Sequence, residues 1–277
     1  MAALIFSILC IPCLVICFFS TREVISANQA KKENARESKQ KGSLLKSFIQ
    51  AFQDRNARML ILAMIFVLIA IMGRMGIQAY YFIYVLGDAE KMAACVSAMG
   101  IGMLLPGVYV PFILNRVDKK WAGTAGNILM GLCCVALYFA AETNASLGVL
   151  VVIHFLMGLF NTQQVACFTL AAEIIDDNWI RTGHRIDGTL YACVSFATKL
   201  GNAIGSSVGI LTLAAVGYVA NAQLESSVLS NMNKVINFGP FVFFMLAAIF
   251  FALINMTNAK GRENEEIVKK MVEEKSE

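Results

Sequence analysis

The stretch that decides the fold runs from residue 59 to residue 86 and reads MLILAMIFVLIAIMGRMGIQAYYFIYVL. Its single charge is Arg74, and apolar and polar residues do not alternate along it. A helix needs about 20 apolar residues to cross a hydrocarbon core roughly 30 Å thick, whereas barrel strands are about 10 residues long and alternate. The stretch is therefore predicted to be a transmembrane helix, which satisfies its own backbone hydrogen bonds.

The rest of the 277-residue chain repeats this pattern. It is 58% hydrophobic and 15% charged, with a mean hydropathy of +0.65, whereas charged residues make up about a quarter of soluble domains. These values exclude a water-soluble enzyme and predict an all-α integral membrane protein. The predicted spans cover residues 2–20, 59–86, 92–114, 122–141, 148–171, 188–219 and 237–256.

The basic residues orient these spans, because Lys and Arg accumulate in short cytoplasmic loops. When the spans alternate, 19 of the 23 Lys and Arg residues fall on one side. They lie in residues 21–58, 115–121, 172–187 and 257–277. The opposite loops hold only Lys91 and Lys234. The N-terminus is therefore predicted to be outside and the C-terminal tail cytoplasmic, the tail forming a solvated helix.

The first span could also be read as a secretory signal peptide. It lacks a basic n-region, however, and its positive charges follow the apolar run, which favours a membrane helix. A chain that opens directly in a span is expected to be part of a larger protein. In the basic connector after it, apolar residues at helical spacing predict a short amphipathic helix at the membrane surface. These residues are Leu44, Leu45, Phe48, Ile49 and Phe52.

All eight cysteines lie inside apolar blocks, so we expect them to be reduced, small packing residues. Cys10 and Cys13 form a C-x-x-C, which could be a redox pair or half of a metal site. No second pair and no nearby histidine completes it. No metal site is expected.

The strongest candidate for function inside the membrane is Lys199, about a dozen residues into its span and therefore near the midplane. Ser195, Lys199, Asn202 and Ser206 form one polar stripe at helical spacing. Gly201, Gly205 and Gly209 form a small-residue ridge on a different face, which predicts close packing against another helix. The stripe is predicted to line a pathway. The alternative is a lysine paired with a carbonyl or carboxylate inside the bundle.

Two other spans carry polar candidates. Arg74, Gln78 and Tyr81 share one face, and either a pathway role or a structural ion pair fits them equally well. Asn161 and Gln164 are predicted to share a face of the fifth span, where they could contact solute hydroxyls or bond to neighbouring helices.

The loop 172–187 gathers charges of both signs. Such a run can be simply solvated, but it also suits salt bridges that close the inner face of a carrier and break when it opens. The predicted gate residues are Glu173, Asp176, Arg185 and Asp187. Glu173 and Asp176 are placed to reach Arg185 across the turn.

Three segments resemble the glycoside-pentoside-hexuronide:cation symporters. They read YYFIYVLGDAE at 80–90, AEIIDD at 172–177 and TGHRIDG at 182–188, the last continuing through Lys199 to Gly217-Tyr218. These symporters belong to the major facilitator superfamily and have twelve helices in two six-helix halves. The resemblance implies a C-terminal six-helix bundle over residues 59–256, preceded by one extra transmembrane helix over 1–20 that corresponds to family helix six. Residues 21–58 would form the central cytoplasmic loop and 257–277 a cytoplasmic tail.

The resemblance also implies roles for single residues. Lys199 corresponds to a lysine that neighbours the sugar and the coupling cation, and Ser195 to a hydroxyl residue close to that site. Glu173, Asp176, Arg185 and Asp187 fall on a cytoplasmic charged network. The expected coupling cation is Na⁺, Li⁺ or H⁺. Its acidic ligands lie largely in helices one to five of the family, which have no counterpart in this sequence.

Three classes of function differ in how well they fit this sequence. The leading one is a secondary carrier, or its C-terminal portion, that transports a sugar or glycoside by cation-coupled symport. A truncated membrane fragment that does not transport would show the same sequence features. A membrane enzyme would need a nucleophile or metal-ligand cluster that this sequence lacks, so no enzyme is expected. Expected partners are the lipid bilayer, a sugar or glycoside, and a separate N-terminal half or a second copy; nucleic acid is not expected.

Overall fold

The computed structural model describes residues 2–20, 52–183, 187–219 and 224–273 and divides the chain into two units. The first unit, Met1–Lys46, contains helix α1 (Ala2–Ser20). From Cys10 to Ser20 every side chain of α1 is exposed, although this segment is strongly apolar. Water would not tolerate such a surface, so α1 requires a lipid or protein environment. Of the residues proposed for an amphipathic surface helix, Phe52 is exposed and the other four lie outside the described residues.

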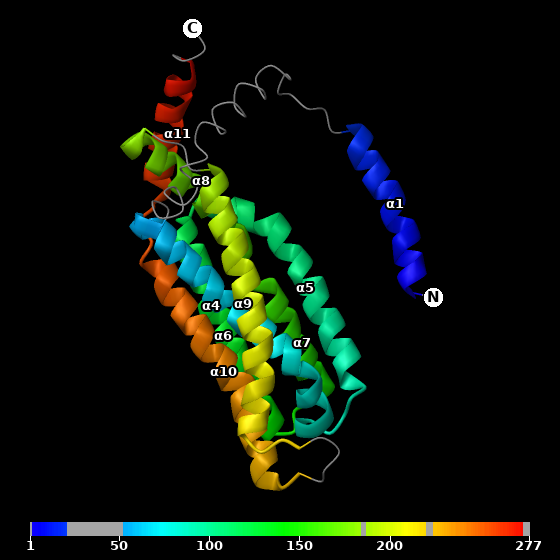
Figure 1. Cartoon of the computed structure of the whole chain (residues 1–277). Helices are drawn as coiled ribbons and strands as arrows, with labels where there is room; N and C mark the ends of the chain where they lie inside the picture. Colours follow the sequence, from blue (N-terminus) through cyan, green and yellow to red (C-terminus); the bar gives the residue numbers. More distant parts are fainter. Residues whose placement is uncertain (1, 21–51, 184–186, 220–223, 274–277) are drawn as a thin grey trace. The chain divides into compact units, whose positions relative to one another are not determined.

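The second unit, Ser47–Glu277, is a bundle of membrane-length helices with a helical tail (Figure 1). Its elements are α4 (Arg55–Tyr80), the π-helix η1 (Tyr81–Val85), α5 (Lys91–Leu114), α6 (Lys119–Glu142), α7 (Leu147–Leu159), α8 (Gln163–Thr182), α9 (Asp187–Ala215), α10 (Ser226–Ala252) and α11 (Asn258–Glu273). The described elements are all helices, which confirms the predicted all-α fold.

Five segments of the described residues are long and apolar enough to cross a membrane. They are Arg55–Val85, Lys91–Leu114, Lys119–Glu142, Leu147–Thr182 and Ser226–Ala252. The first predicted span contains a shorter apolar helix, Cys10–Ser20. Helix α9 has 29 residues, enough for about 43 Å, but its polar stripe and glycines lower its hydropathy.

Three predicted boundaries are wrong. The fifth span is not one helix, because the chain breaks between Leu159 and Gln163. Helix α8 then continues to Thr182, so most of the predicted loop 172–187 is helical and ends at Gly183, whose φ of +71° suits a residue without Cβ. The seventh span begins at Ser226, eleven residues earlier than predicted, because apolar packing continues through its polar first turns.

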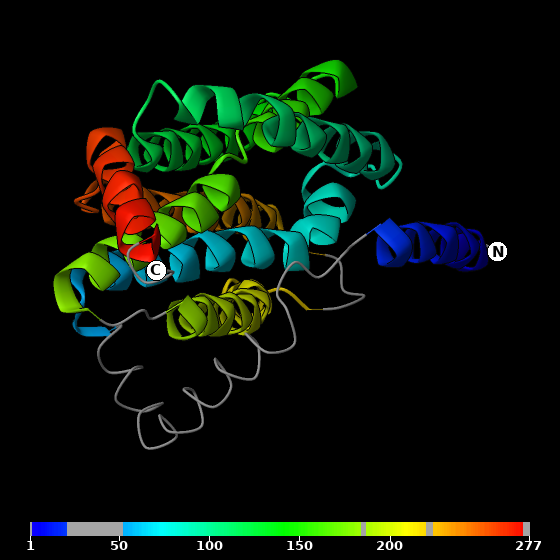
Figure 2. The same cartoon turned by 90° about the horizontal axis from the view of Figure 1, so that it is seen from above.

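Helix α9 packs on α4, α10 on both α4 and α6, and α5 on α7. Seen from above, α9 lies on one side of α4, while α5 and α6 lie on the other (Figure 2). Buried side chains form two main clusters along the bundle. One contains Leu60, Ile174 and Phe251, and the other contains Tyr81, Leu137 and Phe244. The first cluster thus includes the beginning of α4, and the second includes the residue that follows its end.

Candidate functional site

The polar stripe of α9 faces away from the bundle. Ser195, Lys199 and Ser206 are exposed, and Asn202 is partly buried, with its Oδ1 atom buried and unbonded. Among the described residues Lys199 has no hydrogen bond or ion pair. These residues therefore do not support the alternative that Lys199 is paired with a carbonyl or carboxylate inside the bundle. The Lys199 ammonium therefore lies midway along α9 on the outer surface of the bundle.

The glycine ridge explains why the stripe faces outward. A Cβ at Gly205 would lie 2.9 Å from Ile69 Cα, and one at Gly209 would lie 2.6 Å from the Gly73 carbonyl oxygen. Only hydrogen at these positions allows the backbones of α9 and α4 to approach so closely. The predicted close packing of the ridge is therefore confirmed, and it directs the opposite face of α9 away from α4.

Arg74 lies in a different place, in the interior between α4, α6 and α10. It is 4% exposed, and its Nη1 donates to Asn237 Oδ1 at 2.9 Å and to the Ile236 carbonyl at 3.3 Å. Its guanidinium lies over the Tyr81 ring, 5.8 Å from the centroid, and the Tyr81 hydroxyl donates to the Leu137 carbonyl. The Nη2 atom of Arg74 and the Nε2 atom of Gln78 are buried donors without a partner. The structure thus brings Arg74, Gln78 and Tyr81 together, apart from Lys199.

Of the two roles considered for Arg74, a direct ion pair is not seen among the described residues, where a chain of amides leads away from the guanidinium instead. Asn237 Nδ2 donates to Asn233 Oδ1 at 2.8 Å, and Asn233 Nδ2 donates to Glu142 Oε1 at 2.9 Å. Within the described residues the guanidinium itself contacts no carboxylate. Sequence reasoning missed Asn233 and Asn237, whose spacing of four residues places them on one helix face.

Asn161 and Gln164 do not share a helix face, contrary to the prediction. The break between α7 and α8 leaves Asn161 buried and Gln164 exposed. The buried partner is Gln163, whose Nε2 donates to Asn161 Oδ1 at 2.8 Å and approaches Met130 Sδ at 3.1 Å. Gln163 was missed because a continuous helix was assumed across a break that no proline marks.

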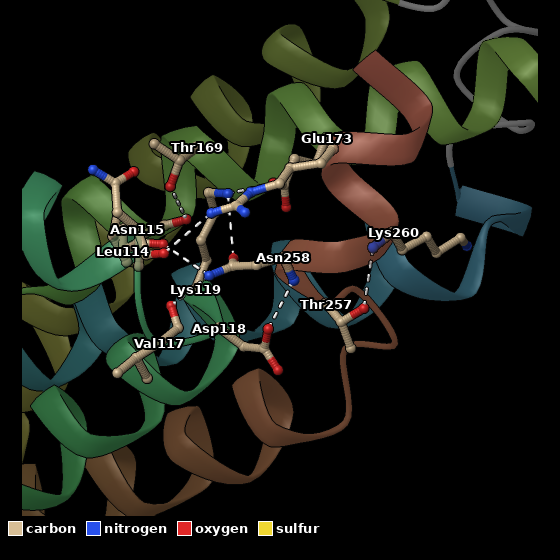
Figure 3. Close-up of polar contacts among 12 residues, drawn as sticks. Leu114, Asn115, Val117, Asp118, Lys119, Thr169, Glu173, Thr257, Asn258 and Lys260 are labelled. Carbon is tan, nitrogen blue, oxygen red and sulfur yellow. Dashed lines mark hydrogen bonds and ion pairs between the residues drawn. The ribbon is translucent and has the colours of Figure 1, made fainter. Parts of the chain in front are cut away.

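A charge cluster joins α8, the α5–α6 loop and α11 (Figure 3). Lys119 pairs with Glu173 and lies 3.4 Å from Asn258 Oδ1. Asp118 Oδ1 accepts from the Asn258 backbone N–H at 2.7 Å, and Asn258 Nδ2 donates to the Leu114 and Val117 carbonyls. The first turn of α11 is therefore fixed to the bundle by both backbone and side-chain bonds.

Asp177 is the second centre of this cluster, and sequence reasoning did not select it. It is buried and accepts from Lys260 Nζ at 2.6 Å, Arg181 Nε at 3.3 Å and Asn264 Nδ2 at 3.4 Å. Arg181 also pairs with Asp54, which caps α4 by accepting from the Ala57 N–H. Since the tail makes these contacts on one face, it is not a fully solvated helix.

The predicted gate residues are only partly described. Glu173 is in the cluster with Lys119, and Asp176, which is half-buried on α8, is not without a partner. Arg185 and the side chain of Asp187 lie outside the described residues, so the pairing of Arg185 stays a prediction. All four segments predicted on one side of the membrane nevertheless contribute to the contacts at this end. They are represented by Asp54, Lys119, Glu173 and Asn258.

On the outer face of α11, Lys269 donates to Glu265 at 2.8 Å. This hydrogen bond holds the pKa of the Glu265 carboxyl below its usual value and raises the pKa of the Lys269 ammonium. Both side chains are solvent exposed. This pair therefore belongs to the solvated side of α11, opposite the Asp177 contacts.

Comparison with known proteins gives matches along almost the whole chain. A family model described as "MFS/sugar transport protein" matches residues 1–258. The chain is 27% identical over 249 residues to the Escherichia coli "Glucuronide carrier protein homolog", covering 90% of this chain and 52% of that protein. It is 25% identical over 255 residues to the "Isoprimeverose transporter" of Lactiplantibacillus pentosus, covering 90% of this chain and 50% of that protein. The chain thus spans about half the length of these curated relatives.

Proposed function

Because this chain belongs to the MFS/sugar transport protein family, we propose that it supplies the C-terminal half of a secondary carrier for a sugar or glycoside, driven by cation symport. The resemblance to the glycoside-pentoside-hexuronide:cation symporters is confirmed by the family match and by relatives named as a glucuronide carrier protein homolog, an isoprimeverose transporter and a putative glycoside/cation symporter. The relatives are about twice as long, so we infer that a complete carrier needs a second bundle.

The observation that carries this proposal is the outward-facing stripe around Lys199. A charge near mid-bilayer costs on the order of 2.5–3.5 kcal/mol on insertion scales, so it should face a polar cavity instead of lipid. In secondary carriers such a cavity forms between two bundles, near the bilayer midplane. Lys199 lies twelve residues after the start of α9, about 18 Å along the helix axis. Lys199, Ser195 and Asn202 would then contact the solute from one side.

The remaining features of the carrier are also proposals. The coupling cation would be Na⁺, Li⁺ or H⁺, bound mainly by acidic residues of the other bundle. The distribution of basic residues supports a plasma-membrane orientation with the N-terminus outside and α11 in the cytoplasm. In that orientation the contacts among Asp118, Lys119, Glu173 and Asn258 lie on the inner face, where they could stabilise an inward-closed state.

Uptake of radiolabelled neutral and anionic glycosides tests the proposal. Cells lacking the relevant carriers would express this chain together with the first five helices of a full-length relative, under Na⁺, Li⁺ and H⁺ gradients. We expect saturable, cation-dependent uptake that Lys199→Ala abolishes. Lys234→Ala, which removes an exposed lysine of α10, is the matched control and should leave uptake unchanged. Full uptake by a Lys199→Ala chain present at normal levels in the membrane would contradict the assignment.

A further inference from the structure

An apolar groove of about 540 Å³ lies between α5, α6 and the break that separates α7 from α8. Its wall includes Tyr109, Ile113, Trp121, Ala125, Leu129 and Phe160. The volume falls in the range of ~300–1,000 Å³ that is typical of ligand sites. The groove is therefore large enough to hold part of a bound molecule.

The two hydroxyl groups of the wall are already bonded within the protein. The Tyr109 hydroxyl donates to the Leu159 carbonyl, and the Thr162 hydroxyl donates to the Ala122 carbonyl at 2.9 Å. A hydroxyl-rich solute would find almost no donors or acceptors here and would lose its hydration. The chemistry of the wall suits a hydrocarbon chain.

The groove is separate from the stripe of Lys199. It is built on α5 and α6, which lie on the opposite side of α4 from α9 (Figure 2). Its rim is open to the surroundings of the bundle, since Trp121 is 50% exposed and Ile113 40% exposed. For a membrane protein these surroundings include lipid.

One end of the groove is basic. Lys120 places its ammonium 5.5 Å from the centroid of the Trp121 ring, and exposed Arg116 adjoins Val117 of the wall. Lys119 is engaged with Glu173, and Arg262 of α11 donates to the Asn115 carbonyl at 3.3 Å. Among the described residues, Arg116 and Lys120 are the cations next to the wall itself. Tryptophan and basic residues at a helix end are typical of the level of lipid headgroups.

We propose that this groove binds an acyl chain of an anionic phospholipid, with the lipid phosphate between Arg116 and Lys120. The wall follows α6 from Trp121 to Leu129, about 12 Å, in the direction in which an acyl chain enters the bilayer. A zwitterionic lipid would fill the same groove, but it would neutralise the two cations less well. The charge at the rim therefore selects the anionic headgroup.

Native mass spectrometry of the purified full-length chain in detergent tests the headgroup. Phosphatidylglycerol and phosphatidylethanolamine with identical acyl chains are compared. We expect a preference of about tenfold or more for phosphatidylglycerol, since each basic residue near the headgroups adds to binding of anionic lipid. Arg116→Gln with Lys120→Gln should abolish this preference. Arg55→Gln with Arg58→Gln, two exposed arginines of α4, is the matched control and should retain it.

A groove-filling variant tests the acyl chain. Ala125→Trp should weaken binding of both lipids, whereas Ala136→Trp, at an exposed alanine of the same helix outside the groove, should not. Glycerol phosphate should not compete, because it has no acyl chain. Equal binding of the two lipids, or an Ala125→Trp variant that binds them like Ala136→Trp, would overturn the proposal. A dimer that Ala125→Trp dissociates, with no lipid bound, would assign the groove to a second copy instead.

Discussion

Arg74 is the residue whose burial the bundle must compensate most carefully. A buried charge is costly unless it is paired or hydrogen-bonded, and this guanidinium has an amide, a carbonyl and an aromatic face as partners. Asn237 is itself held by Asn233, which bonds to Glu142. The positive charge in the interior is therefore connected to a carboxylate through two amides.

Removing the amide next to Arg74 should destabilise the bundle. Asn237→Ala leaves a second nitrogen of the buried guanidinium without its side-chain partner, so we expect a loss of about 2–4 kcal/mol in unfolding free energy. Denaturant unfolding in mixed micelles would measure it. Asn231→Ala, at an exposed position on the same helix, should change little. Arg74→Met combined with Asn237→Leu should be more stable than Asn237→Ala alone, since no charge then remains buried.

At the scale of elements, the packing of α9 on α4 determines which face of α9 is exposed. The glycine ridge allows close approach of the two helices, and the polar stripe, which lies on a different face of α9, is left on the surface. A short distance between backbones also strengthens dispersion contacts along the whole pair. One face of α9 thus serves stability, while the other presents Lys199.

Two glycine-to-alanine changes should have opposite effects. Gly209→Ala places a methyl group 2.6 Å from the Gly73 carbonyl, so we expect a loss of about 1–3 kcal/mol. Gly100→Ala adds a methyl group in open space within α5, so it should stabilise by up to ~1 kcal/mol through helix propensity. Thermal unfolding of both variants in the same detergent gives the comparison. A stable Gly209→Ala chain would argue against the tight α4–α9 contact.

A further element-level prediction concerns α11. Lys260→Glu places a carboxylate next to buried Asp177, so α11 should detach and its amides should exchange at least about tenfold faster. Hydrogen exchange with mass spectrometry would detect this. Lys269→Glu, on the exposed face of the same helix, is the control and should leave exchange nearly unchanged. Adding Asp177→Asn to Lys260→Glu should restore part of the protection, because it removes the repulsion.

At the scale of the whole molecule, the second unit exposes surfaces that water would not tolerate. Leu104, Phe112 and Leu211 are among the many large apolar side chains on its outside. Lys199 lies exposed among such surfaces on α9. Lipid can cover the apolar side chains, but Lys199 needs a polar environment. A second bundle over the stripe would provide it.

The isolated chain should therefore be unable to accumulate sugar against a gradient. Alternating access requires two bundles that move about a shared site, and this chain supplies one bundle of that kind. Purified chain reconstituted in liposomes, with imposed Na⁺ or H⁺ gradients, should show no cation-dependent uptake. We also expect it to aggregate or to form homodimers. Coupled uptake in such liposomes would mean that two copies assemble a working carrier.

The sequence by itself determined the features that depend on composition and period. Apolar runs of membrane length indicated the helices, and the basic segments indicated which ends lie together, as the contacts of Asp54, Lys119 and Asn258 confirm. The spacing of Gly201, Gly205 and Gly209 predicted a packed ridge on α9. These features are local, because the bilayer imposes the same length and hydrogen-bonding rules on every span.

Only the tertiary structure decided which polar groups meet. Arg74 and Asn237 are far apart in sequence, and nothing in the spacing of either helix indicates that they bond. The same holds for Lys119 with Glu173 and for Lys260 with Asp177. The break before Gln163 also escaped prediction, because the contact of its side chain with Met130 forms only when α6 packs beside it. These side-chain contacts depend on which helices pack against each other. The hydrophobic period of a segment predicts that it is a helix, but it does not predict which helix packs on it.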